Sequence, residues 1–294
     1  MLKFIITLFY DKIRIGSQNI FTAKAFSASS NSSEETFMKN LFISLAIILF
    51  TTSCFAQKEL NFDVEGTKRT AVIYEGNAKT KKSSIVFVFH GHGGNARFAE
   101  RRLNFHDAWK EALVVYMQGI PGVVGITDKA GTKNGWQKNP NELDDRDIKF
   151  FDEVLKQLSK DYKVDDTRIY AVGHSNGARF VNVLWAMRGE KFAAFCSVAA
   201  QGGLMIRDAL PKSIWMSIGE NDPIVPAEGQ KLSIPVVQKI LKVDASKGVI
   251  DGEITTYKGT NKTELVVEIR NAGHEFPQDS IPKMVEFFKR NVNK

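Results

Sequence analysis

Cysteine is scarce in this chain: its 294 residues include only Cys54 and Cys196. Cys54 lies in an N-terminal segment that we predict to be removed, which leaves no second thiol for a disulfide. Cys196 lies in the apolar run 192–199, which predicts a core strand, and we interpret it as a packing residue. The cysteine content therefore excludes a disulfide scaffold and does not support a cysteine nucleophile.

Patterns for binding metals or nucleic acids are also missing. His90 and His92 are two residues apart, but without a third ligand nearby they do not predict a metal site. The formal net charge of +7 is a modest excess, and the densest basic run, 79–82, predicts a solvated loop before a strand. The sequence contains no internal repeat and no nucleic-acid module. We therefore expect no metal, no cofactor and no nucleic-acid partner.

The apolar run 41–50 is too short for a comfortable transmembrane span. It follows a lysine and precedes small residues that end at Ala56, which is the pattern of a secretory signal peptide over residues 38–56. We therefore expect a secreted or periplasmic protein. The alternative is a protein anchored by a lipid on Cys54.

Residues 1–37 precede that signal peptide and have no evident role. We interpret them as a non-structural upstream extension, with translation beginning at Met38. The alternative is an unusually long leader whose first apolar stretch, 4–10, contacts membrane. Residues 57–294 then form a single domain of a length and composition suited to one core.

The motif Gly-His-Ser-Asn-Gly at 173–177 is the most informative stretch of the chain. Residues 168–172 before it are β-branched and aromatic, which predicts an interior strand, and residues 178–187 after it have apolar side chains at helical spacing. A nucleophilic serine needs such a strand, sharp turn and helix, because its hydroxyl must project clear of the backbone. The motif predicts Ser175 as the nucleophile, although a bare Gly-x-Ser-x-Gly also occurs by chance in surface loops.

A serine nucleophile requires a general base and an acid that orients the base. Asp222 follows the predicted strand 213–218, and His274 follows the predicted strand 264–269. Serine, acid and then histidine is the chain order of α/β-hydrolases. It differs from the orders found in chymotrypsin-like and subtilisin-like proteases. We therefore predict Asp222 as the acid and His274 as the base, with Glu220 as the rival acid.

Donors for the oxyanion are predicted in two places. The apolar strand 84–89 runs into His-Gly-His-Gly-Gly, which resembles the His-Gly loop of lipases and esterases. Its glycines let backbone N–H groups approach a developing negative charge. We predict the N–H groups of Asn176 and His92 as the donors, with Gly91 or Gly93 as substitutes for His92.

From about residue 71 to residue 288 the chain resembles the polyhydroxybutyrate depolymerase and feruloyl esterase group of α/β-hydrolases, relatives of carbohydrate esterase family 1. The resemblance implies an α/β-hydrolase fold with a mostly parallel central sheet and helices on both faces. The residues that carry it are 90–94 (His-Gly-His-Gly-Gly), 144–147 (Asp-Asp-Arg-Asp), 164–170 (Val-Asp-Asp-Thr-Arg-Ile-Tyr), 222–226 (Asp-Pro-Ile-Val-Pro) and 273–277 (Gly-His-Glu-Phe-Pro).

The resemblance also implies that Ser175, Asp222 and His274 form a catalytic triad. Two positions depart from the group: Ala178 stands where glycine is common, and Phe276 stands where tryptophan is frequent. Both changes are conservative. The implied activity is that of a secreted serine carboxylic-ester hydrolase acting on feruloyl or acetyl esters of plant polysaccharide or on hydroxyalkanoate oligomers.

The residues that bind the substrate are harder to predict from the sequence, because loops form the pocket. Trp136, in the loop 131–140, is a candidate wall for an aromatic or sugar ring, and its alternative is a local packing anchor. Asp144, Asp145 and Asp147 are interpreted as capping and charging the start of the next helix rather than as catalytic residues. Two other functions remain open, a serine peptidase and a non-catalytic protein that binds carbohydrate or the cell envelope, and the oligomeric state is not predicted.

Overall fold

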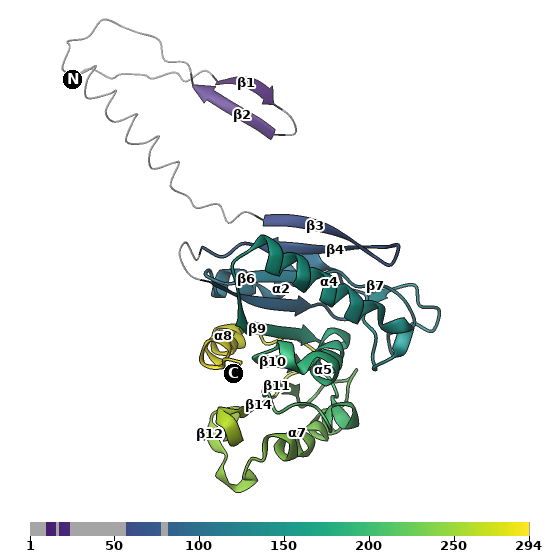
Figure 1. Cartoon of the computed structure of the whole chain (residues 1–294), viewed down its shortest axis with the longest axis vertical. Helices are drawn as coiled ribbons and strands as arrows, with labels where there is room; N and C mark the ends of the chain where they lie inside the picture. Colours follow the sequence, from purple (N-terminus) through teal and green to yellow (C-terminus); the bar gives the residue numbers. More distant parts are fainter. Residues whose placement is uncertain (1–9, 16–17, 24–56, 78–81, 294) are drawn as a thin grey trace, which may run out of the picture. The chain divides into compact units, whose positions relative to one another are not determined.

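The computed structural model divides into two units, Met1–Cys54 and Phe55–Lys294 (Figure 1). Across both units it describes residues 10–15, 18–23, 57–77 and 82–293. In the first unit β1 (Tyr10–Ile15) and β2 (Gln18–Ala23) pair as an antiparallel hairpin. This hairpin lies within residues 1–37, where the sequence predicted no structural element. The predicted signal peptide, Cys54 included, lies outside the described residues.

The second unit is built on a ten-stranded sheet with the order β12-β13-β14-β11-β10-β9-β5-β6-β4-β3. The six neighbours from β14 to β6 are parallel, whereas the outer pairs at both edges are antiparallel. The mostly parallel sheet expected from the sequence is therefore confirmed. The strands are β3 Gln57–Val64, β4 Thr67–Tyr74, β5 Ser83–Phe89, β6 Leu113–Met117, β9 Val164–His174, β10 Ala194–Val198, β11 Ser213–Gly219, β12 Val249–Asp251, β13 Ile254–Lys258 and β14 Glu264–Arg270, and a separate small pair is β7 Ile120–Pro121 with β8 Asn134–Gly135.

The central strands are rich in apolar residues because both faces of the sheet are covered. In β5, Ile85, Phe87 and Phe89 belong to the core on one face, while Val86 and Val88 belong to the core on the other. All five side chains are fully buried. Side chains of a strand alternate between faces, so a continuous apolar run is what a central strand needs.

Helices cover both faces of the sheet, as the sequence predicted (Figure 1). One core includes side chains of α4, α5 and α7, and the other includes side chains of α2, α3 and α8. Within the part of the chain that the structure describes, no helix has the length and apolar content to cross a membrane. The helices are α2 Ala96–Leu103, α3 Phe105–Ala108, α4 Arg146–Asp161, α5 Asn176–Arg188, α6 Ala227–Lys231, α7 Ser233–Leu241 and α8 Ile281–Arg290, with short 3₁₀ turns η1 Glu142–Asp145, η2 Gly189–Lys191, η3 Gly203–Ile206, η4 Ala245–Lys247, η5 Thr260–Lys262 and η6 Gln278–Ser280.

A buried ion pair joins α4 to β4. The Arg69 guanidinium donates to the Asp147 carboxylate at 2.8 Å, and both side chains are almost fully buried. The other carboxylate oxygen accepts the N–H of Gln137 at 2.8 Å, and the guanidinium lies 4.2 Å from the centre of the Phe150 ring. Asp147 does lie in the first turn of α4, as expected, but its main contact is this ion pair.

Cys196 lies in β10, which is paired on both sides, with β9 and with β11. Its side chain is fully buried, and burial raises the pKa of its thiol. The interpretation of Cys196 as a packing residue is confirmed.

Candidate active site

Ser175 lies at the turn between β9 and α5, with φ 56° and ψ −121°. Few residues other than glycine adopt a positive φ, and such strain is found mainly at functional positions. The flanking glycines are needed for close packing. A Cβ atom on Gly173 would lie 2.4 Å from the carbonyl carbon of Gly177, and one on Gly177 would lie 2.3 Å from the carbonyl oxygen of Phe89. The two glycines therefore let α5 and β5 approach the turn that carries the serine.

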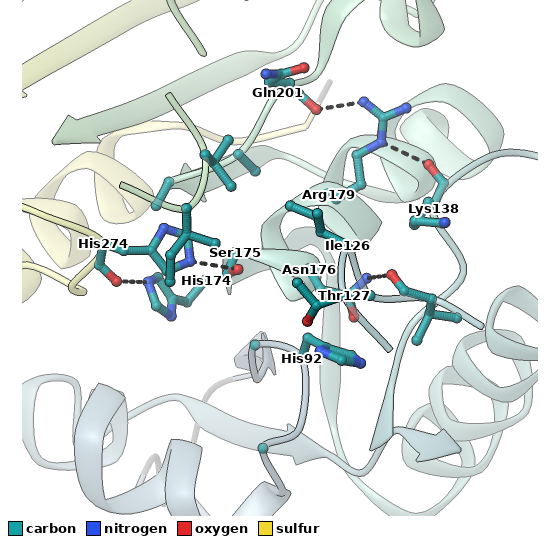
Figure 2. A pocket seen from close by; sticks show the side chains of 18 of the residues that line it. His92, Ile126, Thr127, Lys138, His174, Ser175, Asn176, Arg179, Gln201 and His274 are labelled. Atoms are coloured by element: carbon teal, nitrogen blue, oxygen red, sulfur yellow. Dashed lines mark hydrogen bonds between the residues drawn. The ribbon is translucent and has the colours of Figure 1, made fainter. Parts of the chain in front are cut away.

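The structure brings Ser175, Asp222 and His274 into one hydrogen-bonded row. His274 Nε2 lies 2.8 Å from Ser175 Oγ, and His274 Nδ1 lies 2.7 Å from Asp222 Oδ2 (Figure 2 shows the first of these contacts). The three residues follow β9, β11 and β14, which are parallel, so their carboxyl ends meet at one edge of the sheet. A carboxylate accepts the Nδ1 proton, which leaves Nε2 free to accept the serine proton.

The Asp222 carboxylate is held by four donors. Oδ1 accepts the N–H groups of Ile224 and Val225, each at 2.8 Å, and Oδ2 accepts Gln230 Nε2 at 3.0 Å as well as His274. Burial raises the pKa of Asp222, but the hydrogen bonds from His274 and from the two backbone amides outweigh it, and the pKa is lowered. The group is therefore a fixed, charged acceptor at neutral pH.

Glu220, the rival acid, lies elsewhere. Its side chain is 52% exposed and lies 3.8 Å from the Nζ atom of Lys231, while its backbone N–H donates to the carbonyl of Arg270. The geometry therefore places Asp222 and not Glu220 against the imidazole of His274.

His174 supports the loop that carries His274. Burial lowers the pKa of His174 to about 4, so the ring is neutral at pH 7 and its Nε2–H donates to the backbone carbonyl of His274 at 3.0 Å (Figure 2). The ring also packs 5.1 Å from the His274 ring and 6.2 Å from the Phe276 ring, centre to centre. This role of His174 could not be predicted from the sequence, because the end of β9 is brought beside the loop after β14 only by the order of the strands in the sheet.

The two predicted oxyanion donors border the same cavity as Ser175. Among the described residues, neither the N–H of His92 nor that of Asn176 donates a hydrogen bond, so both stay available to a ligand. Asn176 is the first residue of α5, where the helix dipole is positive. The N–H of Gly93 donates to Asn134 at 2.7 Å and is therefore not a free substitute.

His90 holds the loop of residues 90–94 in place. Its Nε2 accepts the N–H of Gly119 at 2.9 Å, and its Nδ1–H donates to the carbonyl of Gly91 at 2.8 Å. Burial lowers its pKa to about 4, which keeps the ring neutral. Both ring nitrogens are thus occupied by backbone groups.

Trp136 does not form a wall of the cavity, so the interpretation of this residue as a substrate contact is wrong. Its side chain is fully buried, stacks on Phe180 with 5.5 Å between ring centres, and donates to the carbonyl of His90 at 2.9 Å. Its backbone N–H and carbonyl bond the side chain of Asn176 at 2.8 and 2.9 Å. Trp136 is the packing anchor of the alternative interpretation, and it braces the turn that carries Ser175.

A cavity of about 670 Å³ opens beside Ser175. Three exposed apolar side chains contribute to its walls: Phe98 (49% exposed), Ile126 (70%) and Ile224 (55%). At another part of the wall Arg179 reaches between Gln201 and Lys138 (Figure 2). Lys138 and Asn139 of the loop 131–140 do line the cavity, but a place in its wall could not be predicted for Phe98, Ile126 or Ile224, because they lie in loops and on a helix whose relative positions depend on the fold.

The sheet order, the helices on both faces and a serine on a sharp strand-to-helix turn define an α/β-hydrolase fold. Solved esterases share it. Acetyl xylan esterase from Aspergillus awamori is 15% identical, with a TM-score of 0.57, over 79% of this chain and 99% of the other. A CE1 ferulic acid esterase from Anaeromyces mucronatus is 16% identical, with a TM-score of 0.55, over 80% of this chain and 90% of the other. The expected likeness to this group is therefore confirmed at the level of the fold.

A curated protein is similar in sequence. NocK of Nocardia uniformis subsp. tsuyamanensis, whose name describes an inferred esterase, is 28% identical over 155 residues. The match covers 49% of this chain and 42% of NocK, so the chain spans less than half the length of that relative. No protein-family model matches the chain.

Proposed function

We propose that this protein is a serine carboxylic-ester hydrolase. The observation that carries the proposal is the imidazole of His274, whose two nitrogens contact Ser175 Oγ and Asp222 Oδ2 at 2.8 and 2.7 Å. This is the hydrogen-bonding geometry that activates a serine for attack on a carbonyl. The esterases that share the fold support an ester as the substrate.

The chemistry follows from that row of contacts. Ser175 Oγ attacks the ester carbonyl carbon while His274 Nε2 takes the serine proton, and the Asp222 carboxylate stabilises the imidazolium. The N–H groups of His92 and Asn176 donate to the oxyanion of the tetrahedral intermediate. His274 then gives its proton to the departing alcohol, and water enters by the reverse steps to release the acid from Ser175.

The proposed substrates are acetyl or feruloyl esters of plant polysaccharide or hydroxyalkanoate oligomers. The apolar walls of the cavity suit the acyl part of such esters. We propose export of the protein, as secreted or periplasmic, from the signal-peptide pattern of residues 38–56, with a lipid anchor on Cys54 as the alternative. A serine peptidase would use the same three side chains, and a binding protein would have no need of their hydrogen-bonded row.

The test is hydrolysis of p-nitrophenyl acetate by the full-length protein and by Ser175→Ala. We expect hydrolysis to fall to the background rate in Ser175→Ala, because no other side chain replaces the nucleophile. Ser246→Ala, at an exposed serine of η4, is the matched control and keeps full activity. Turnover of p-nitroacetanilide in preference to the ester would favour the peptidase. A folded protein without activity on either compound would favour the binding protein.

A further inference from the structure

A second hollow of about 670 Å³ adjoins the cavity beside Ser175. The two hollows share three lining residues, Asn139, Arg179 and Gln201. Arg179 is bonded through all three of its side-chain nitrogens: Nε donates to the carbonyl of Lys138, one terminal nitrogen to the carbonyl of Gln201, and the other to Asn139 Oδ1, each at 2.8 Å. Figure 2 shows the guanidinium between Gln201 and Lys138. The boundary between the two hollows is therefore a fixed feature.

The second hollow exposes two leucines to solvent. Leu204 is 72% exposed and Leu232 is 69% exposed, and both line the hollow together with Met205. An exposed leucine forgoes the stabilisation that its burial would contribute to folding. Exposed apolar side chains that gather in a hollow next to a catalytic cavity are therefore candidates for ligand contact.

A buried serine holds the two leucines in place. Ser233 follows Leu232 and begins α7, and its Oγ accepts the N–H groups of Gly202 and Gly203 at 2.9 and 3.0 Å. Gly202 and Gly203 lead into η3, which contains Leu204, and Gly203 has a φ of +54° that favours glycine. One hydroxyl thus ties the turn of Leu204 to the turn of Leu232. The backbone positions of the two leucines are therefore fixed relative to each other before a ligand binds, which lowers the cost of binding.

The chemistry of this surface points to an aliphatic ligand. None of the lining side chains of the second hollow, all within the described chain, is aromatic. Aromatic faces supply the apolar contact and the hydrogen-bonding edge that suit mixed ligands such as sugar rings. Leucine and methionine offer only apolar contact. The polar side chains of the hollow are of two kinds: Asn139, Arg179 and Gln201 belong to the border that it shares with the first cavity, and Arg207 and Asp208 form an exposed ion pair with each other.

We propose that this surface, Leu204 and Leu232 with Met205, binds an aliphatic segment that continues the substrate beyond its ester bond and past Arg179. We call it the leucine subsite. The proposal rests on the proposed ester hydrolysis at Ser175 and narrows it to esters with an extended aliphatic acyl or alcohol part. A sugar-borne acetyl ester would leave the leucine subsite empty.

The test compares two substrate series on the full-length protein: p-nitrophenyl esters from acetate to decanoate, and alkyl acetates from methyl to decyl. We expect kcat/KM to rise with chain length in at least one series. In the double variant Leu204→Ser/Leu232→Ser, the ratio of kcat/KM for the longest ester to that for the shortest falls by about tenfold or more. Ile250→Ser removes an equally exposed residue of β12 that lines neither hollow, and it keeps the wild-type ratio.

The outcomes separate the two proposals. One outcome overturns the leucine subsite and leaves the proposed function standing. In it, p-nitrophenyl acetate is hydrolysed, but the ratio of kcat/KM for the longest ester to that for the shortest is the same in the wild type and in the double variant for both series. If no ester is hydrolysed, the proposed function fails. The subsite is then decided by calorimetry of decyl acetate binding to the Ser175→Ala protein: binding that the two leucine substitutions weaken supports the subsite, and binding that they leave unchanged overturns it.

Discussion

Asp222 shows at the scale of a single residue how the fold assigns a role. Two carboxylates, Glu220 and Asp222, follow β11, and both are close to the predicted base in the chain. Only Asp222 has its oxygens filled by backbone amides, Gln230 and His274. These donors leave the carboxylate one direction in which to accept the Nδ1 proton of the imidazole. The orientation of His274 is thereby set by a group that is itself immobile.

Asp222→Asn is expected to lower kcat for p-nitrophenyl acetate by about three to four orders of magnitude. The amide still accepts the two backbone N–H groups, so the fold is retained, but its NH₂ group facing His274 favours the wrong tautomer. The measurement is kcat together with the thermal midpoint of unfolding. Glu220→Gln is the matched control and keeps wild-type activity. Near-normal activity in Asp222→Asn would show that another group orients the base.

The residues of the hydrogen-bonded row could be predicted from the sequence, because each one follows a strongly apolar strand in a distinctive chain order. Trp136 and His174 could not. The sequence places Trp136 in a loop, and its burial depends on Phe180 of α5 and on His90, which are distant in the chain. His174 looks like a spacer between glycine and serine until the loop after β14 is placed beside it.

At the scale of elements, the contact between α4 and β4 depends on the ion pair of Arg69 and Asp147 (Overall fold). Both charges are withdrawn from water, and the nearest opposite charge to each is the other. Breaking such a pair typically costs more than the pair contributes, because one charge stays buried alone. The position of α4 on the sheet is therefore sensitive to single substitutions here.

Arg69→Met is expected to lower the free energy of unfolding by about 3 kcal/mol, since it removes the cation at 2.8 Å from the buried Asp147 carboxylate and leaves the more distant Nε of Arg146, at 3.6 Å. The double variant Arg69→Met/Asp147→Leu removes both charges and should recover most of that loss. Urea denaturation measures both. Lys149→Met breaks an exposed pair with Asp144 and serves as the control, with a loss of about 0–1 kcal/mol. A small effect of Arg69→Met would mean that water reaches the pair.

The inner strands and the helices after them could be predicted from the sequence more readily than the sheet edges. β5 and β11 are buried on both faces, so most of their residues are apolar and the runs are recognisable in the sequence. In β3 the first five side chains include no buried one, and all three residues of β12 are exposed, which removes that signal. These edge strands are defined by their pairing with a neighbouring strand. Such pairing cannot be predicted from the residues of one segment alone.

At the scale of the whole molecule, two neutral histidines connect folding to pH. Burial lowers the pKa of His90 and of His174 to about 4, whereas an unfolded histidine titrates near 6.5. Between these values the unfolded chain binds more protons than the folded one, so stability rises with pH. The contribution of both residues is complete above about pH 6.5 and is lost as the pH falls toward 4.

We therefore expect the free energy of unfolding to fall by about 3 kcal/mol per histidine between pH 6.5 and pH 4. Urea titrations at intervals across this range measure the slope. His174→Gln keeps a donor at the same reach but cannot be protonated, so its slope should be smaller than that of the wild type by the contribution of one buried ring. A wild-type free energy that stays constant from pH 6.5 to pH 4 would show that both rings are already charged in the folded protein.

The thiol of Cys196 can report on local opening of the central sheet. It is the one thiol after residue 56, and it sits in a strand with partners on either side, so a labelling reagent reaches it only when the middle of the sheet separates. Where opening and closing are fast relative to labelling, the rate of modification under native conditions measures the population of that opened state. Exposure of the sheet centre can thus be followed at a single atom, without denaturant and independently of turnover at Ser175.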